Sequence, residues 1–90
     1  MSRVRLVVRG RVQGVGFRYA AVDQARRLRL IGWARNLPDG AVEIVAEGPD
    51  ADVQALQQWA QRGPPSARVL RVEESAAPSD ELGPEFRVRF

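Results

Sequence analysis

The sequence predicts an α+β fold in which two helices pack on one face of a four- to five-stranded antiparallel sheet. Several short segments alternate apolar and charged side chains, as strands with one buried and one exposed face do. Two longer segments repeat apolar residues at helical spacing. Their order is strand, helix, strand, strand, helix, strand, followed by a last short strand. This order is that of the ferredoxin-like split βαβ sandwich.

The first half of the chain is expected to begin with a strand over residues 3–12. One face of this strand is apolar and carries Val4, Leu6, Val8 and Val12. The other face, interrupted by Val7, carries the arginines Arg3, Arg5, Arg9 and Arg11. Residues 17–30 then change to helical spacing, with an apolar stripe of Ala21, Ala25 and Leu28. Gly32 is expected to end this helical region.

The second half contains a hairpin, a helix and two further strands. Strands over 33–37 and 41–47 are joined by Pro-Asp-Gly, a strong turn signal. A helix is expected to open near Pro49, which suits a first turn, and to stop at the glycine and prolines of 63–65. A strand over 68–73, a polar loop and a last strand over 86–90 complete the chain, and the last strand has three inward side chains: Phe86, Val88 and Phe90.

The composition bounds the possible chemistry. Ninety residues predict one domain, residues 1–90, without room for a second core. No apolar run approaches the ~20 residues that cross a bilayer, and the N-terminus lacks the features of a signal peptide, so a cytoplasmic protein is expected. The absence of Cys and His excludes disulfides, thiolate ligands and the commonest general base. Any reaction must therefore use Arg, Asn, Gln, carboxylates, hydroxyls or the backbone.

The net charge of +3 is distributed unevenly. Residues 1–35 hold nine arginines and one acid, whereas residues 36–90 hold five arginines and ten acids. Such asymmetry can indicate an anionic partner. Alternatively, the basic half pairs with the acidic half, because the first and third strands are neighbours in this topology. We prefer this second interpretation, in which an arginine row faces a glutamate row across two strands: Arg3, Arg5 and Arg9 against Glu43 and Glu47.

Residues 10–18, "GRVQGVGFR", join the first strand to the first helix, and we call them the glycine loop. A turn of small residues can point successive N–H groups into one concavity, and a helix N-terminus adds partial positive charge. Arg18 can add two parallel donors to a tetrahedral oxyanion. The loop lacks the Lys-Ser/Thr of a nucleotide P-loop and the third glycine of a dinucleotide loop. Phosphate binding and a merely flexible turn remain equally open on these residues alone.

Two motifs carry a resemblance to a known family. "GRVQGVGFR" followed by "GWARNLPDGAVEI" at 32–44 resembles the acylphosphatase family, which shares both motifs in this order. "GPPSARV" at 63–69 and the final "FRVRF" resemble later landmarks of that family, so the likeness spans the chain. Ala34 stands where Val is usual, and the Thr common soon after the arginine is missing. We interpret both departures as packing changes, although the second could lower rate or stability.

The resemblance implies hydrolysis of acyl phosphates to a carboxylate and inorganic phosphate, without metal or cofactor. It implies that Asn36 orients the attacking water, and that Arg18 and the backbone N–H groups of the loop bind the phosphate. The implied phosphate-binding residues are Gln13, Gly14, Val15, Gly16, Phe17 and Arg18. The expected partners are an acyl phosphate and inorganic phosphate as product and inhibitor, with no nucleic acid and no membrane. A monomer is expected.

This chemistry suits the residues that the chain possesses. A carboxylate leaving group needs no general acid, and a loose phosphoryl transition state asks mainly for positioning and charge stabilisation. The Asn36 amide offers both donors and an acceptor for a water. Taken alone, Asn36 is better explained as a turn residue, and the resemblance reverses that preference. The Gln13 amide is equally explained as loop packing. Phe17, Trp33 and Trp59 are expected in the core.

Two other functions are consistent with the fold. RNA-binding domains of this fold class stack bases on aromatic residues of the open sheet face. Here that face is expected to carry Val7 and Val45 among charged residues and no aromatic ring. A non-catalytic binding or maturation module is the other alternative, because acylphosphatase-like domains also occur fused in larger proteins.

Overall fold

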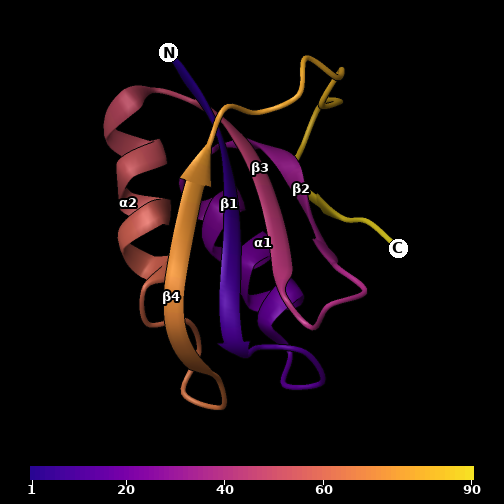
Figure 1. Ribbon diagram of the computed structural model, residues 1–90. Helices are drawn as coiled ribbons and strands as arrows, with labels where there is room; N and C mark the ends of the chain where they lie inside the picture. Colours follow the sequence, from indigo (N-terminus) through magenta and orange to yellow (C-terminus); the bar gives the residue numbers. More distant parts are fainter.

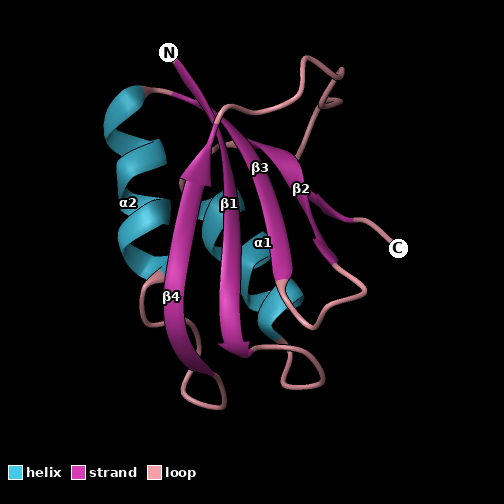
Figure 2. Cartoon of the chain, in the orientation of Figure 1, coloured by secondary structure: helices cyan, strands magenta, loops and turns pink.

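A single sheet of five strands carries both helices on one of its faces, as Figures 1 and 2 show. This computed structural model describes all residues from 1 to 90. The elements follow the expected order: β1 (Ser2–Arg11), α1 (Phe17–Arg27), β2 (Ile31–Asn36), β3 (Val42–Gly48), α2 (Asp50–Ala60), β4 (Arg68–Ser75) and β5 (Arg87–Val88). The strand order in the sheet is β4-β1-β3-β2-β5. The predicted ferredoxin-like class is therefore confirmed.

One strand departs from the predicted antiparallel sheet. The pairs of β1 with β3, β1 with β4 and β2 with β3 are antiparallel, but β5 runs parallel to β2. The sheet is mixed because the chain leaves β4 at the end of the sheet where β2 begins, crosses to the other edge and then runs beside β2 in the same direction. The pairing is shorter than the expected strand over 86–90. Beyond it, only the Arg89 N–H continues the contact, donating to the Ala34 carbonyl at 2.8 Å.

The expected end of the first helix is also wrong. α1 ends at Arg27, and Arg29 adopts a positive φ of 58°, which reverses the chain before β2. Gly32 does not terminate the helix but lies inside β2 with a φ of 142°. A Cβ atom at Gly32 would lie 1.9 Å from the Val45 carbonyl oxygen of the neighbouring strand. This close approach of two backbones, rather than helix termination, requires glycine there.

The main core lies between the helices and the sheet. α1 contributes Phe17, and β5 is preceded by Phe86; both side chains are almost fully buried. Phe17 packs against Trp59 of α2 at 5.3 Å between ring centroids, which joins the two helices. Phe17 therefore ties the start of α1, next to the glycine loop, into the core. Neither helix is long and apolar enough to cross a membrane.

A second, smaller apolar cluster covers part of the opposite sheet face. Trp33 and Val45 lie on that face under Leu82, and all three are 2% exposed or less. The expectation that this face is uncovered and lacks an aromatic ring is wrong. The connection from β4 to β5 must pass from one sheet edge to the other, and it brings Leu82 over Trp33. Leu82 thereby shields the Trp33 ring from stacking with a nucleic-acid base.

Ion pairs join the basic and acidic halves of the chain, as the preferred interpretation of the charge asymmetry predicts. Arg3 pairs with Glu47 at 2.8 Å, and both Arg5 and Arg35 donate to Glu43. Burial of Glu43 acts to raise its pKa, but the hydrogen bonds and positive charges of these two arginines together outweigh burial and lower the pKa. Arg9 departs from the expected row and pairs with acids of β4 and the β2–β3 turn, Glu73 and Asp39.

Candidate active site

The glycine loop turns sharply between the end of β1 and the start of α1. Gly14 and Gly16 adopt φ angles of 75° and 77°, a left-handed conformation that other residues adopt at a cost. Gly16 is the N-cap of α1. A Cβ atom at either glycine would meet no atom within 4 Å. The glycines are therefore required by backbone conformation, and the space above the loop is open.

The backbone N–H groups of the loop are free to bind a ligand. The first hydrogen bond of the helical region runs from the Ala20 N–H to the Gly16 carbonyl at 3.0 Å. None of the N–H groups from Gln13 to Arg18 donates to a protein acceptor. The first turn of α1 also contains no acidic residue. These groups, with the positive end of the helix dipole, make the loop attractive to an anion.

Two side chains hold the loop in place. The Gln13 amide nitrogen donates to the carbonyl oxygens of Leu37 and Ala41, at 2.7 and 2.8 Å, and so ties the loop to the β2–β3 hairpin. On the other side, the Ser66 hydroxyl donates to the Val15 carbonyl at 2.7 Å. The Gln13 side chain therefore acts in loop packing, one of its two open interpretations, and leaves its backbone N–H available. Ser66 was not singled out by the sequence, because only the fold brings it to the loop.

Arg18, the second residue of α1, has a guanidinium group without a protein acceptor. It forms no ion pair and donates no hydrogen bond to another residue. Its guanidinium carbon lies 5.7 Å from the ring centroid of Tyr19 and 5.1 Å from that of Phe90. Phe90 was expected to point inward, but it is 91% exposed because strand pairing stops at Val88. Arg18 thus keeps all its donors for a ligand.

Asn36 is the last residue of β2 and carries an unusual acceptor. Its side-chain Oδ1 atom is buried and has no hydrogen-bond partner in the protein. Buried polar atoms almost always have a partner, so an unpaired one suggests a role outside the fold. The next residue, Leu37, accepts the hydrogen bond from Gln13, which places Asn36 beside the glycine loop. The predicted site residues on the loop and on β2 therefore come from adjacent segments.

The two hollows of the molecule lie away from these residues. One, of about 370 Å³, is lined by Gln54, Gln57 and neighbouring residues between α2 and β4. The other, of about 280 Å³, is lined by residues that include Arg26 and Pro84. Neither includes Arg18 or Asn36. The candidate site is consequently an open surface loop, which suits a small anion held by backbone groups better than a large enclosed ligand.

Known proteins with a similar sequence or structure agree with the family resemblance of the motifs and with the observed fold. The acylphosphatase family model matches residues 4–88. The acylphosphatase of Anaeromyxobacter dehalogenans (strain 2CP-C) is 55% identical over 89 residues, covering 98% of this chain and 95% of that protein. The crystal structure of acylphosphatase from Bacillus subtilis has a TM-score of 0.91 and 38% identity, covering the whole of both chains. Thermococcus kodakarensis HypF has a TM-score of 0.86 and 33% identity, covering 100% of this chain and 12% of that one. The chain belongs to the acylphosphatase family and is an acyl phosphate hydrolase.

Proposed function

We propose that the hydrolysis proceeds by in-line attack of water on a phosphoryl group held at the glycine loop, without metal or cofactor. The backbone N–H groups of residues 13–18 and the Arg18 guanidinium bind the phosphate, and Asn36 orients the water. The observation that carries this proposal is the run of N–H groups from Gln13 to Arg18 that have no protein acceptor, next to an arginine without a carboxylate.

The loop and Arg18 match the charge of the group that they would hold. An acyl phosphate carries a dianionic phosphoryl group whose oxygens accept hydrogen bonds in several directions. Backbone donors held by the turn can supply these bonds without reorganisation, and the planar guanidinium can add a bidentate pair. Because Gln13 and Ser66 hold the loop at both sides, its donors are arranged before the substrate arrives.

Asn36 is suited to the attacking water. Its unpaired Oδ1 atom can accept a hydrogen bond from the water, which satisfies a buried acceptor that the fold leaves unused. That bond directs a lone pair of the water toward phosphorus. An orienting group of this kind matters most in the transition state, because only there does the position of the water decide the rate.

The reaction needs no stronger acid or base than these groups. A bond forms between the water oxygen and phosphorus while the bond from phosphorus to the bridging oxygen breaks, and the bridging oxygen departs as part of a carboxylate. With a pKa of about 4, as for side-chain carboxylates, this leaving group departs without a proton. A water proton passes to a phosphoryl oxygen, and the loose transition state is stabilised by the donors around it.

The proposal is tested by hydrolysis of benzoyl phosphate with purified protein, with and without EDTA. We expect the same rate in both conditions and competitive inhibition by inorganic phosphate. Strict dependence on Mg²⁺ or Zn²⁺ would overturn the metal-independent mechanism. A single domain over residues 1–90, the monomeric state, the cytoplasmic location and the absence of nucleic-acid and membrane partners stay predictions.

A further inference from the structure

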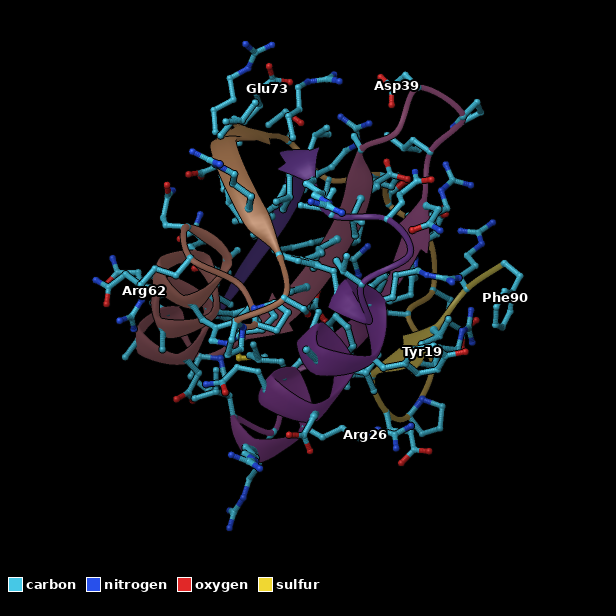
Figure 3. All side chains as sticks on the ribbon, turned by 90° about the horizontal axis from the view of Figure 1, so that it is seen from below. Tyr19, Arg26, Asp39, Arg62, Glu73 and Phe90 are labelled. Carbon is cyan, nitrogen blue, oxygen red and sulfur yellow. The ribbon has the colours of Figure 1, made fainter.

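Two exposed aromatic rings flank the arginine of the candidate site. The protein exposes four large hydrophobic side chains: Met1, Tyr19, Leu70 and Phe90. Of these, Tyr19 and Phe90 are 59% and 91% exposed, and both lie within 6 Å of the Arg18 guanidinium carbon. Figure 3 shows these two side chains on the same side of the molecule. Exposure of an aromatic ring to water is energetically unfavourable. Two exposed rings beside the same guanidinium group therefore suggest that this surface contacts an apolar group of a ligand.

The backbone before Phe90 is anchored beside the candidate site. Val88 is paired in parallel with Ala34 of β2, and the Arg89 N–H donates to the Ala34 carbonyl. The Arg89 guanidinium carbon also lies 4.8 Å from the ring centroid of Trp33. The chain therefore runs along the end of β2 toward Asn36. The Phe90 ring is held near Arg18 by these contacts, although its own surface is almost wholly exposed.

We propose that Tyr19 and Phe90, which we call the aromatic rim, bind the acyl group of the substrate and make the enzyme selective for aromatic or bulky apolar acyl phosphates. The inference rests on the proposed function. In an acyl phosphate the carbonyl carbon is bonded to the bridging oxygen, so the acyl group begins within two bonds of the phosphorus. Side chains in contact with the guanidinium that binds the phosphate are therefore the nearest ones available to that group.

The chemistry of the rim defines the substrates that it favours. An aromatic acyl group can pack against the rings in an offset or edge-to-face arrangement, and either contact removes apolar surface from water. A methyl group, as in acetyl phosphate, is too small to cover either ring. A contact worth about 1 kcal/mol corresponds to a preference of roughly 5- to 10-fold for each ring.

The test compares benzoyl phosphate with acetyl phosphate in Phe90→Ala and Tyr19→Ala, with Leu70→Ala as a matched control. Leu70 is 75% exposed and belongs to β4, at the sheet edge opposite to β5. In the rim variants we expect kcat/KM for benzoyl phosphate to fall roughly 5- to 10-fold through KM. The value for acetyl phosphate and the inhibition constant of inorganic phosphate should hardly change. Leu70→Ala should leave all three quantities unchanged.

Three results would count against the aromatic rim. An unchanged ratio between the two substrates would show that the acyl group is bound elsewhere or not at all. An equal loss for both substrates, together with weaker inhibition by phosphate, would show that the rings position Arg18 and do not contact substrate. If the wild-type protein hydrolysed neither compound, the proposed function itself would fail, and the inference with it.

Discussion

Asn36 offers the sharpest separation of a functional from a structural role, because its Oδ1 atom is buried without a partner. Replacement by Ala removes no hydrogen bond of the fold and relieves an unsatisfied acceptor, which typically costs about 1–3 kcal/mol. The loss of packing from the small side chain opposes this gain. We therefore expect the free energy of unfolding of Asn36→Ala to lie within about 1 kcal/mol of wild type.

The activity of the same variant should fall steeply. Loss of one group that acts in the transition state reduces kcat by about 10²- to 10³-fold. Phosphate inhibition should remain nearly unchanged, because the loop and Arg18 hold the phosphoryl group while Asn36 contacts only the water. Asn36→Asp keeps the shape, removes the donors and adds negative charge, so it should be inactive and should also bind phosphate more weakly.

Three measurements on wild type and both variants distinguish a functional from a structural role of Asn36: kcat with benzoyl phosphate, the inhibition constant of phosphate, and urea unfolding. The expected pattern is a large fall in kcat with stability preserved. The reasoning would be refuted if Asn36→Ala lost phosphate affinity as severely as Arg18→Ala, because Asn36 would then be a phosphate ligand. A loss of several kcal/mol in stability would instead show that Asn36 supports the fold.

Further perturbations test the remaining interactions. Arg18→Ala should reduce kcat at least about 10²-fold without unfolding the protein. Arg18→Lys should restore little of this activity, because an ammonium group cannot donate the two parallel hydrogen bonds of a guanidinium. Steady-state kinetics measures the activity of both variants, and circular dichroism checks that they are folded. Glu43→Gln should cost about 2 kcal/mol in urea unfolding at pH 7, since Glu43 is 4% exposed but its two arginines are more accessible. Burial acts to raise the pKa of Glu43, but the hydrogen bonds and charges of its two arginines together lower the folded pKa below 4.5. This stability difference should therefore be complete above pH 4.5 and shrink as the pH falls through the folded pKa. Gly32→Ala should prevent stable folding, seen as lost cooperativity in thermal unfolding, because its methyl group would overlap the Val45 carbonyl. Gly14→Ala should lower the free energy of unfolding by only about 1–2 kcal/mol, since no atom lies near the added methyl group.

Helices and strands with a local sequence signal were predictable from the amino-acid sequence. Alternation in 3–12 and the helical stripe after Phe17 specify backbone periodicity and the buried side, so the order of strands and helices followed from them. The need for glycine in the loop could also be inferred from the sequence, because a turn with a positive φ restricts the residue type. Arg18 and Asn36 could be singled out because two specific motifs surround them, although neither motif shows what the side chains contact.

Contacts between residues far apart in the sequence became apparent only in the folded chain. The path from β4 to β5 brings Leu82 over Trp33 and places β5 parallel to β2, and no periodicity in a polar loop encodes that crossing. The same path carries Phe90 to Arg18, where alternation had predicted an inward ring. The unpaired acceptor of Asn36 appears only when every neighbouring donor is placed. A local pattern constrains dihedral angles and one buried face, whereas contacts between remote segments depend on the complete course of the chain.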